Sequence, residues 1–194
     1  LLTGCKGQLG LTFSLLFKSS PLVHKFNLHE VDIDDFDLSD QQAIPTKLTS
    51  FSPSIILNCG AYTAVDKAED NRGLAKGVNA DSVGIISNWC AENSCRLIHI
   101  STDFVFNGAK ETPYSPSDKA NPLGVYGRTK LQGEKHILRE LPDSGAIVRT
   151  SWLYSEFGNN FVKTMLDLMS KKTELNVVAD QIGSPTSTHS LSRV

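Results

Sequence analysis

The sequence is poor in the features that hold secreted or metal-bound proteins together. Its four cysteines, Cys5, Cys59, Cys90 and Cys95, are scattered, with no Cys-x-x-Cys pair and no histidine at zinc-ligand spacing. No positively charged, apolar leader opens the chain. We therefore expect reduced and mostly buried thiols, no disulfide framework, no bound metal, and a reducing cytoplasm as the compartment.

An excess of charge of one sign is also lacking. Lys and Arg number 19 against 21 for Asp and Glu, which gives a formal net charge of −2. No broad basic field is available to hold a nucleic-acid backbone or an anionic membrane. The longest stretch of low charge, Leu9 to Phe17, is far shorter than the roughly 20 apolar residues that a membrane span needs. We expect a soluble protein with neither nucleic acid nor membrane as a partner.

What the sequence does contain is an alternation of short apolar runs with longer amphipathic segments. With 194 residues, 40% of them hydrophobic, the chain can bury the core of one generous domain, or of one domain and the beginning of a second. The alternation is typical of βαβ units around a parallel sheet. Strands are predicted at residues 1–3, 23–28, 54–59, 96–101, 145–150 and 175–178. Helices are predicted at residues 8–17, 39–50, 64–71, 73–92, 122–140 and 159–170.

A glycine loop follows directly after the first predicted strand. Residues 3–10 run Thr-Gly-Cys-Lys-Gly-Gln-Leu-Gly, with glycines three residues apart, and open an apolar helix. Glycine lets the backbone approach a pyrophosphate, while the helix N-terminus supplies unpaired N–H groups and a partial positive charge. A tight turn that packs a helix would explain the glycines equally well in isolation. Placed after the first strand, the loop predicts a dinucleotide cradle made by Gly4, Lys6, Gly7, Gln8 and Leu9.

An acidic residue about 20 positions beyond such a loop usually reaches the adenosine ribose. Asp32, just past the second predicted strand, is the candidate, although three other carboxylates crowd the same loop. A carboxylate at this point favours NADH, whereas Lys6 or His29 could receive the 2′-phosphate of NADPH. The sequence therefore predicts a nicotinamide cofactor and leaves the choice between NADPH and NADH open.

Two further segments are expected to touch the same cofactor. Asp37 and Leu38 would flank the adenine, with an Asp near a helix N-cap as the equally good alternative. The third predicted strand ends in small residues, as a backbone passing close to a cofactor requires. This strand end adds Cys59, Ala61, Tyr62 and Thr63 to the predicted contacts.

Tyr126 and Lys130 lie four residues apart at the beginning of a predicted helix. Positions four apart share a helix face, with Cβ atoms roughly 5–6 Å from one another. A phenol, whose reference pKa is near 10, becomes a useful acid–base group when a neighbouring cation stabilises its phenolate. Lys130 would supply that cation. Tyr126 could then give a proton to a carbonyl oxygen as hydride arrives at its carbon. The pair is common by chance when taken alone.

A third element is the polar end of the fourth predicted strand. Ser101 and Thr102 end this strand, so they project into the crevice outside the carboxyl ends of the sheet, where open α/β folds bind ligands. A hydroxyl here could hold the substrate oxygen in line with Tyr126, and we favour Thr102. Ser101, Tyr126 and Lys130 are also expected to contact the cofactor. Glycine loop, strand-end hydroxyl and Tyr/Lys helix occur in the order that a nicotinamide-dependent oxidoreductase needs.

The predicted fold class is α/β, a Rossmann-like doubly wound parallel sheet with the beginning of a smaller, incomplete substrate lobe. We assign residues 1–153 to an NAD(P)-binding Rossmann domain and residues 154–194 to the start of a substrate-binding lobe. The pattern changes at Tyr154, and only eight residues follow the irregular stretch 180–186. The chain also begins without Met at the end of a strand, so we expect further sequence on both sides.

Seven blocks of sequence carry a family resemblance. They are Thr3 to Gly10, Ala61 to Glu69, Ser101 to Phe106, Val125 to Leu131, Arg149 to Tyr154, Asn159 to Met165 and Asp180 to Thr186. Together they cover nearly the whole chain and resemble the extended short-chain dehydrogenase/reductases and, among these, the dTDP-4-dehydrorhamnose reductases. The last three blocks are the specific ones, because the whole superfamily shares the glycine loop and the Tyr/Lys pair.

The resemblance implies reduction of the C4 ketone of dTDP-4-dehydro-L-rhamnose to dTDP-L-rhamnose with NADPH or NADH, a step in making surface polysaccharides. It implies a catalytic trio of Thr102, Tyr126 and Lys130. The residues implied at the dTDP-sugar are Val65, Thr102, Asp103, Phe104, Tyr126 and Trp152. A core position explains Trp152 equally well, and Val65 could simply anchor its helix.

Phe104 helps to choose among the reactions of this superfamily. Related sugar-nucleotide 4,6-dehydratases have Thr-Asp-Glu at this point, where the Glu is the base that eliminates water. The sequence here is Thr102-Asp103-Phe104, and a phenyl ring accepts no proton. A ketone reduction needs only a proton donor and hydride, so the sequence favours a reductase over a dehydratase.

The segment after the glycine loop departs from the family pattern. Some members bind magnesium at a dimer interface through a carboxylate soon after the glycine loop, and residues 11–14 contain none. We predict no metal, and a homodimer stays open. The alternative is a non-catalytic NAD(P)-binding regulatory subunit, similar to the beta subunit of methionine adenosyltransferase.

Overall fold

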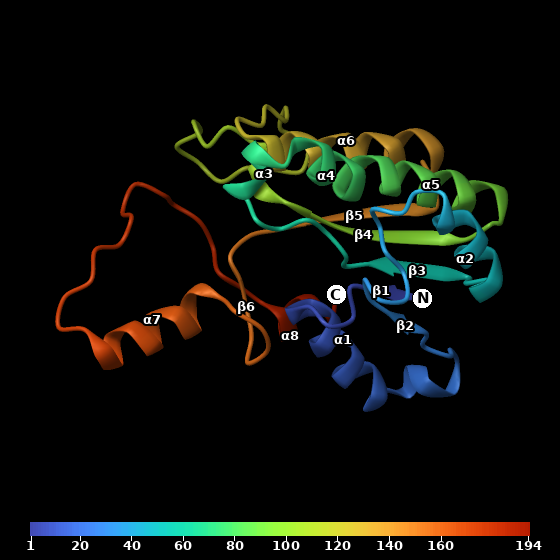
Figure 1. Ribbon diagram of the computed structural model, residues 1–194, viewed down its shortest axis with the longest axis horizontal. Helices are drawn as coiled ribbons and strands as arrows, with labels where there is room; N and C mark the ends of the chain where they lie inside the picture. Colours follow the sequence, from blue (N-terminus) through green and yellow to red (C-terminus); the bar gives the residue numbers. More distant parts are fainter.

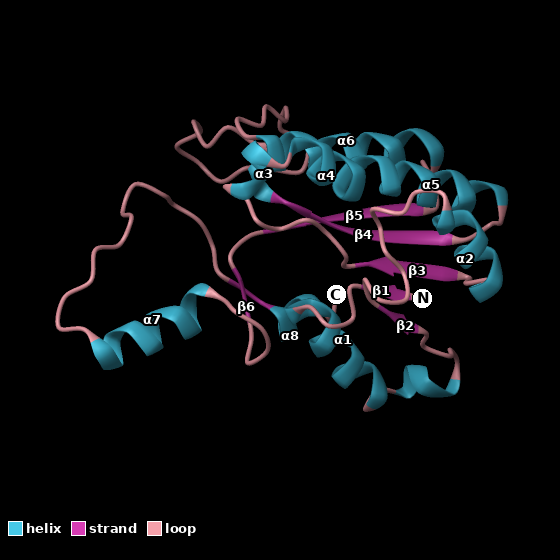
Figure 2. Cartoon of the chain, viewed as in Figure 1, coloured by secondary structure: helices cyan, strands magenta, loops and turns pink.

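A five-stranded parallel sheet forms the centre of the protein. The computed structural model describes residues 1–194. Figure 2 shows the strands side by side in the order β2-β1-β3-β4-β5, and every neighbouring pair is parallel. The strands are β1 (Leu2–Thr3), β2 (Glu30–Val31), β3 (Ile55–Asn58), β4 (Arg96–Thr102) and β5 (Gly145–Thr150).

Helices cover both faces of this sheet. On one face lie α1 (Gln8–Lys18) and the short α8 (Thr188–Leu191). The other face carries α2 (Ala43–Phe51), α4 (Arg72–Lys76), α5 (Ser82–Glu92) and α6 (Val125–Glu140), with α3 (Lys67–Asp70) near the start of α6 (Figure 1). A π-helical turn, η2 (Gly77–Asp81), joins α4 to α5. Strands that alternate with helices on both faces confirm the predicted Rossmann-like doubly wound fold.

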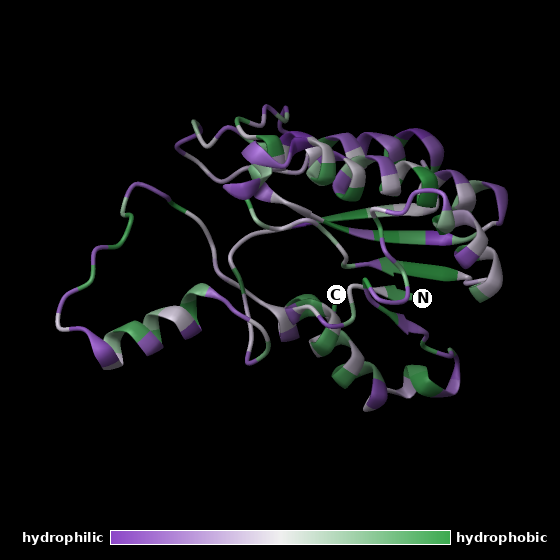
Figure 3. Cartoon of the chain, viewed as in Figure 1, coloured by the Kyte–Doolittle hydropathy of each residue, from purple (hydrophilic) through white to green (hydrophobic).

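The main core lies between the sheet and α2, α5 and α6. Ile56 and Leu97 on the strands and Ile86 and Ile137 on the helices are fully buried in it. The central strands are largely hydrophobic in Figure 3, as expected for a parallel sheet that is covered on both faces. This core fixes the relative positions of the strand ends from which the candidate site is built.

Two predicted strands are wrong. At residues 23–28 the chain forms a 3-10 turn, η1 (Pro21–His24), and β2 comes later, at Glu30–Val31. Ser20 caps this turn by accepting from the Leu22 N–H at 3.2 Å, and Pro21 supplies the fixed φ of a helical start. At residues 175–178 no strand forms, and Val178 is 68% exposed, because no neighbouring strand pairs with this segment.

The last 42 residues form a separate arrangement. A two-residue strand, β6 (Leu153–Tyr154), pairs in parallel with β7 (Thr186–Ser187), neither of which was predicted. Between them α7 (Phe161–Lys171) extends away from the sheet in Figure 1 and has no buried residue. Hydrophobic and hydrophilic residues both occur along this helix in Figure 3. The return to the body is made where Thr188 of α8 contacts Thr12 of α1, with 2.8 Å between the hydroxyl oxygens. No helix of the structure has both the length and the apolar character needed to cross a membrane.

Candidate active site

The glycine loop packs directly against the end of β3. Gly4 has φ +66°, and a Cβ on it would lie 2.7 Å from the Gly60 nitrogen. A Cβ on Gly10 would lie 2.3 Å from the Gly4 carbonyl oxygen. Both contacts are shorter than any side chain allows, so the loop reaches its position only because these residues are glycines.

The first turn of α1 opens above this loop with free backbone donors. The Gly7 N–H donates to the Gly4 carbonyl oxygen at 3.1 Å. The N–H groups of Gln8, Leu9 and Gly10 have no acceptor within the chain, and no acidic residue lies in the turn. Unpaired N–H groups and the positive end of an 11-residue helix make this turn suited to bind a phosphate.

A cleft of about 390 Å³ runs from this turn across the carboxyl edge of the sheet. Nine of the predicted cofactor residues line it: Gly4, Gly7, Asp32, Asp37, Leu38, Cys59, Ala61, Tyr62 and Thr63. Sequence reasoning missed its apolar wall, which is formed by Ile33, Phe36, Leu74 and Val78. The cleft combines a flat apolar wall with acidic groups at its rim, which suits a nucleoside.

Asp32 holds the glycine loop against the end of β2. Its Oδ2 accepts from the Lys6 N–H at 2.8 Å and its Oδ1 accepts from the Ile33 N–H at 2.9 Å. The Lys6 ammonium forms an exposed ion pair with Asp34, which raises the pKa of Lys6 and lowers that of Asp34. Lys6 therefore lies beside the cleft with its charge already partnered by a carboxylate.

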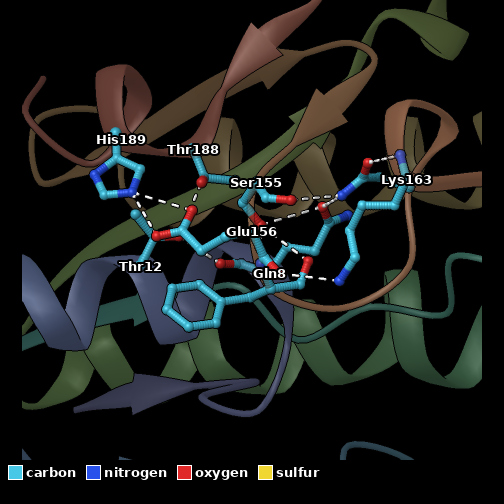
Figure 4. A network of polar contacts seen from close by, with 9 residues as sticks. Gln8, Thr12, Ser155, Glu156, Lys163, Thr188 and His189 are labelled. Carbon is cyan, nitrogen blue, oxygen red and sulfur yellow. Dashed lines mark hydrogen bonds and ion pairs between the residues drawn. The ribbon is translucent and has the colours of Figure 1, made fainter. Parts of the chain in front are cut away.

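The Gln8 side chain points away from the cleft. Its Oε1 accepts from Asn160 Nδ2 at 3.0 Å and lies 3.4 Å from the Ser155 hydroxyl (Figure 4). In the same network His189 Nε2 lies 2.9 Å from the Glu156 carboxylate. The Gln8 side chain thus joins α1 to the segment that precedes α7, and Lys6, Gln8 and Leu9 are not among the residues that line the cleft.

Tyr126 lies in the first turn of α6, where the chain passes closest to the end of β4. The Val125 N–H at the start of the helix donates to Glu69 Oε1 at 2.7 Å. Gly127 brings the helix against η3 (Asp103–Val105), the 3-10 turn that follows β4, because a Cβ on Gly127 would lie 2.1 Å from the Phe104 carbonyl oxygen. The Tyr126 ring meets the Phe104 ring edge to face, with centroids 5.6 Å apart. The predicted proximity of Tyr126 to residues 102–104 follows from these contacts.

Burial raises the pKa of Tyr126. The neighbouring Asp103 carboxylate acts in the same direction, and the Thr102 hydroxyl acts against it. Burial also raises the pKa of Asp103. Tyr126 is therefore a protonated phenol at neutral pH, which suits the donation of a proton.

Lys130 is almost completely buried, at 1% exposure, and its ammonium points toward the sheet. Its Nζ donates to the Ile100 carbonyl at 2.7 Å and lies 3.1 Å from His99 Nε2. Burial lowers the pKa of Lys130 to about 8, against a smaller opposite effect of Glu134 and Cys59. The expected lowering of the pKa of Tyr126 by Lys130 is not seen in this geometry, because Thr102 and Asp103 act on the buried phenol and Lys130 does not.

The two hydroxyls at the end of β4 have different surroundings. Thr102 Oγ1 accepts from the Phe104 N–H at 3.1 Å and lies 3.1 Å from Asp103 Oδ1, next to Tyr126. Ser101 Oγ instead donates to Glu134 Oε1 at 2.5 Å, inside the protein. The side chain of Ser101 is thus committed to the core, and of the two hydroxyls the structure brings only that of Thr102 to Tyr126.

Of the predicted sugar residues, Thr102 is buried at 5% exposure, whereas Trp152, Phe104 and Val65 lie in exposed or half-buried positions. Trp152 is 45% exposed, so the alternative of a core tryptophan is wrong. Its φ of +49° is unusual for a bulky residue, and its indole lies within 3.2 Å of the position of a Cβ on Gly183. Phe104 is 43% exposed, and Val65 lies half-buried in the irregular segment before α3.

Asn79 is a polar link beside the cleft that sequence reasoning missed. From the π-helical turn it accepts from the Tyr62 N–H at 2.9 Å and donates to the Tyr62 carbonyl at 3.0 Å. It also lies 3.3 Å from the Thr129 hydroxyl of α6. Asn79 therefore fixes the cleft wall to the helix that carries Tyr126. A π-turn is often a mark of a functional site, but it cannot be seen in one sequence.

All four cysteines are free, with Cys90 and Cys95 buried and the other two half-buried. The structure has no group of three or more His, Cys, Asp or Glu side chains that could hold a metal ion.

The profile of the family described as the RmlD substrate binding domain matches residues 1–194. The chain belongs to this family. The dTDP-4-dehydrorhamnose reductase of Sinorhizobium fredii is 43% identical over 190 residues, which are 98% of this chain and 62% of that protein. The predicted family resemblance is confirmed.

Solved structures of RmlD-family proteins have the same fold. The dTDP-4-dehydrorhamnose reductase of Clostridium acetobutylicum superposes with a TM-score of 0.92 at 38% identity, over 99% of this chain and 66% of that chain. The Bacillus anthracis enzyme of the same name, in complex with NADP, gives a TM-score of 0.91 at 35% identity over the same shares. The chain thus spans a little under two thirds of these relatives.

Proposed function

We propose that this RmlD-family chain is the cofactor-binding and catalytic part of a dTDP-4-dehydrorhamnose reductase. It would reduce the C4 ketone of dTDP-4-dehydro-L-rhamnose to dTDP-L-rhamnose with NADPH or NADH. The observation that carries the proposal is a shared packing surface. Tyr62 of the cleft and Tyr126 of α6 pack against one small cluster of Ala68, Ala75 and Val125, so the cleft and the proton donor adjoin.

Residues in and beside the cleft would bind the adenosine, the pyrophosphate and the nicotinamide ribose of the cofactor. The free N–H groups of Gln8 and Leu9 would bind the pyrophosphate. Asp32, Asp37 and Leu38 would surround the adenosine, and Lys130 would contact the ribose nearest the nicotinamide. When bound, the cofactor supplies hydride to the ketone carbon.

Tyr126 would give its phenol proton to the ketone oxygen as the carbon is reduced. Its raised pKa supports this direction, because the phenol holds its proton at neutral pH. Thr102 would hold the same oxygen, while Phe104 offers no base for the elimination of water. Lys130, with a pKa of about 8, is mostly charged at neutral pH and would stabilise the phenolate once the proton has left.

The remaining residues would begin the sugar site. We assign residues 1–153 to the cofactor domain and residues 154–194 to the start of a substrate lobe, with Val65, Asp103 and Trp152 facing the sugar. The exposed ring of Trp152 supports this assignment, since an exposed apolar ring suits the flat face of a sugar. A cytoplasmic location follows from the substrate, and a homodimer is the oligomeric state to test by sedimentation.

The test is turnover by the full-length protein. Mixed with dTDP-4-dehydrorhamnose, it should oxidise NADPH or NADH, and Tyr126→Phe should lower kcat by about a hundredfold or more. Tyr114→Phe, in the surface loop beyond β4, is the matched control and should keep wild-type activity. Unchanged nicotinamide absorbance with this and related 4-keto sugars would refute the proposal.

The relatives support the reductase against the regulatory-subunit alternative, because their names are those of enzymes. Stoichiometric capture of a methionine adenosyltransferase, with bound cofactor that is never oxidised, would reverse this preference.

A further inference from the structure

A row of buried polar side chains crosses three strands beneath the site. Thr3, Asn58 and His99 are register partners on β1, β3 and β4. Thr3 Oγ1 lies 2.7 Å from Asn58 Oδ1, and Asn58 Nδ2 lies 3.1 Å from His99 Nδ1. The row ends at Lys130 of α6, whose Nζ lies 3.1 Å from His99 Nε2. All four side chains are at most 2% exposed.

Such a row is unusual at this depth. The strands of a covered parallel sheet are normally apolar, and a buried polar group is costly unless it is hydrogen-bonded. Each member of this row has a partner, so the row is a built network. The proposed reaction uses Lys130 and leaves the other three without a role.

The direction of the hydrogen bonds depends on the charge of Lys130. An ammonium has only donors, so it requires a lone pair on His99 Nε2 and therefore a proton on Nδ1. Nδ1–H must then meet the amide oxygen of Asn58. The structure has the reverse arrangement, with Asn58 Nδ2 facing Nδ1, which suits a proton on Nε2 and an uncharged Lys130 amine. A half-turn of the Asn58 amide converts one arrangement into the other.

We propose that His99 and Asn58 are positioning residues for Lys130, and that the row reverses its hydrogen bonds when Lys130 gains or loses its proton. The proposal rests on the proposed function, in which Lys130 assists Tyr126. When Lys130 is charged, His99 and the Ile100 carbonyl would take two of its three ammonium hydrogens on the sheet side. The third has no partner in the chain and is left for the cofactor side.

The groups around the row are consistent with such an exchange. His99 faces Asn58 from β3 and Lys130 from α6, and burial next to Lys130 holds the pKa of His99 well below 6.5, so the ring stays neutral. Lys130 faces the Cys59 thiol from β3 and Glu134 from its own helix. Glu134 is neutralised by Arg149 of β5, so Lys130 is the group of this cluster that changes charge near pH 8.

The first test reads the tautomer of His99 directly and needs no activity. The full-length protein is labelled with ¹⁵N in its histidine rings, and His99→Gln assigns the His99 signals by their loss. We expect a neutral ring with the proton on Nδ1 at pH 6 to 7, and the proton on Nε2 well above pH 8. A ring that titrates like an exposed histidine, or one tautomer at every pH, would overturn the proposal.

The second test separates positioning from a merely structural role. His99→Gln can still accept from Lys130, whereas His99→Leu cannot. We expect His99→Leu to move the alkaline limb of the kcat/KM profile to lower pH, because the ammonium loses an acceptor, and His99→Gln to restore it. If both variants lose stability equally and leave the limb in place, the proposal is wrong. A failure of turnover in the wild type would refute the proposed function alone, because the ring signals are read without substrate.

Discussion

Two lysines mark opposite ends of the candidate site, and their surroundings differ in almost every respect. Lys130 is buried in the sheet-facing side of α6, with fixed partners on β4. Lys6 lies on the surface beside the cleft, with Asp34 as its partner and side chains that are 62% and 71% exposed. Burial brings the pKa of Lys130 close to neutral pH, and its hydrogen bonds to β4 fix the position of its Nζ. Solvent keeps Lys6 charged and makes its ion pair weak and easily exchanged.

Loss of the buried charge should have the largest effect. Lys130→Met keeps the length of the side chain and removes the ammonium, so kcat should fall by about a hundredfold to ten-thousandfold, as for loss of an acid–base group. Steady-state turnover measures it. Lys135→Met, on the exposed face of the same helix, should leave kcat unchanged. Equal activity of the two variants would remove Lys130 from the mechanism.

The ion pair behind Lys130 should matter more for stability than for catalysis. Arg149 forms two hydrogen bonds with the buried Glu134, at 2.9 and 2.6 Å. Arg149→Met leaves the buried Glu134 carboxylate without its partner, so the free energy of unfolding should fall by about 3 kcal/mol. This value is at the low end for a buried ion pair, because Arg149 is partly exposed. Urea denaturation measures the loss. Arg139→Met, which breaks an exposed pair with Glu140, is the control, and an equal loss there would contradict the contrast.

The buried lysine also gives stability a pH dependence of known sign. Its pKa is about 8 in the folded protein and 10.5 in the free side chain. Between these values the unfolded chain binds a proton that the native protein has released, so the free energy of unfolding rises with pH, by about 1.4 kcal/mol per unit.

Cys59, whose pKa burial raises from 9 to about 12, acts in the opposite sense above pH 9. The sign is therefore read from the difference between the wild type and Lys130→Met in urea denaturation from pH 7 to 10. Parallel pH profiles for the two proteins would show that Lys130 keeps its ordinary pKa.

The exposed lysine should give the smallest effect. Lys6→Ala should raise the KM for NADPH more than that for NADH, by less than about tenfold, because Asp34 and salt already screen the charge. The effect should shrink as ionic strength rises. Lys25→Ala, outside the cleft, is the control. An equal change for both cofactors would exclude contact of Lys6 with a 2′-phosphate.

The contrast between the two lysines also shows what the sequence could predict. Gly4 and Gly7 were recognisable because a local pattern, a strand followed by a glycine loop and a helix, makes the cradle. The pairing of Tyr126 with Thr102 followed from the rule that strand ends meet at one edge of a parallel sheet. In both cases the information lies within one short segment or in one general rule of topology.

The partners of Lys130 were out of reach for the opposite reason. Asn58 meets His99 only through the register of β3 with β4, and Lys130 meets His99 only because α6 packs on the sheet. These segments are far apart in the sequence. The same holds for Ser101, which was expected at the cofactor but is bonded to Glu134. The second strand was predicted at residues 23–28, but Pro21 begins a 3-10 turn that takes up the start of this segment, and the strand forms only at Glu30–Val31.

Gly127 determines how closely α6 approaches the end of β4. The backbone of α6 rests on the Phe104 carbonyl with no room for even a methyl group at this residue. The distance between the Tyr126 phenol and the end of β4 thus depends on the absence of a side chain at the next residue, Gly127. A larger residue at position 127 would therefore push Tyr126 away from Thr102. Activity would be lost although Thr102, Tyr126 and Lys130 were all still present.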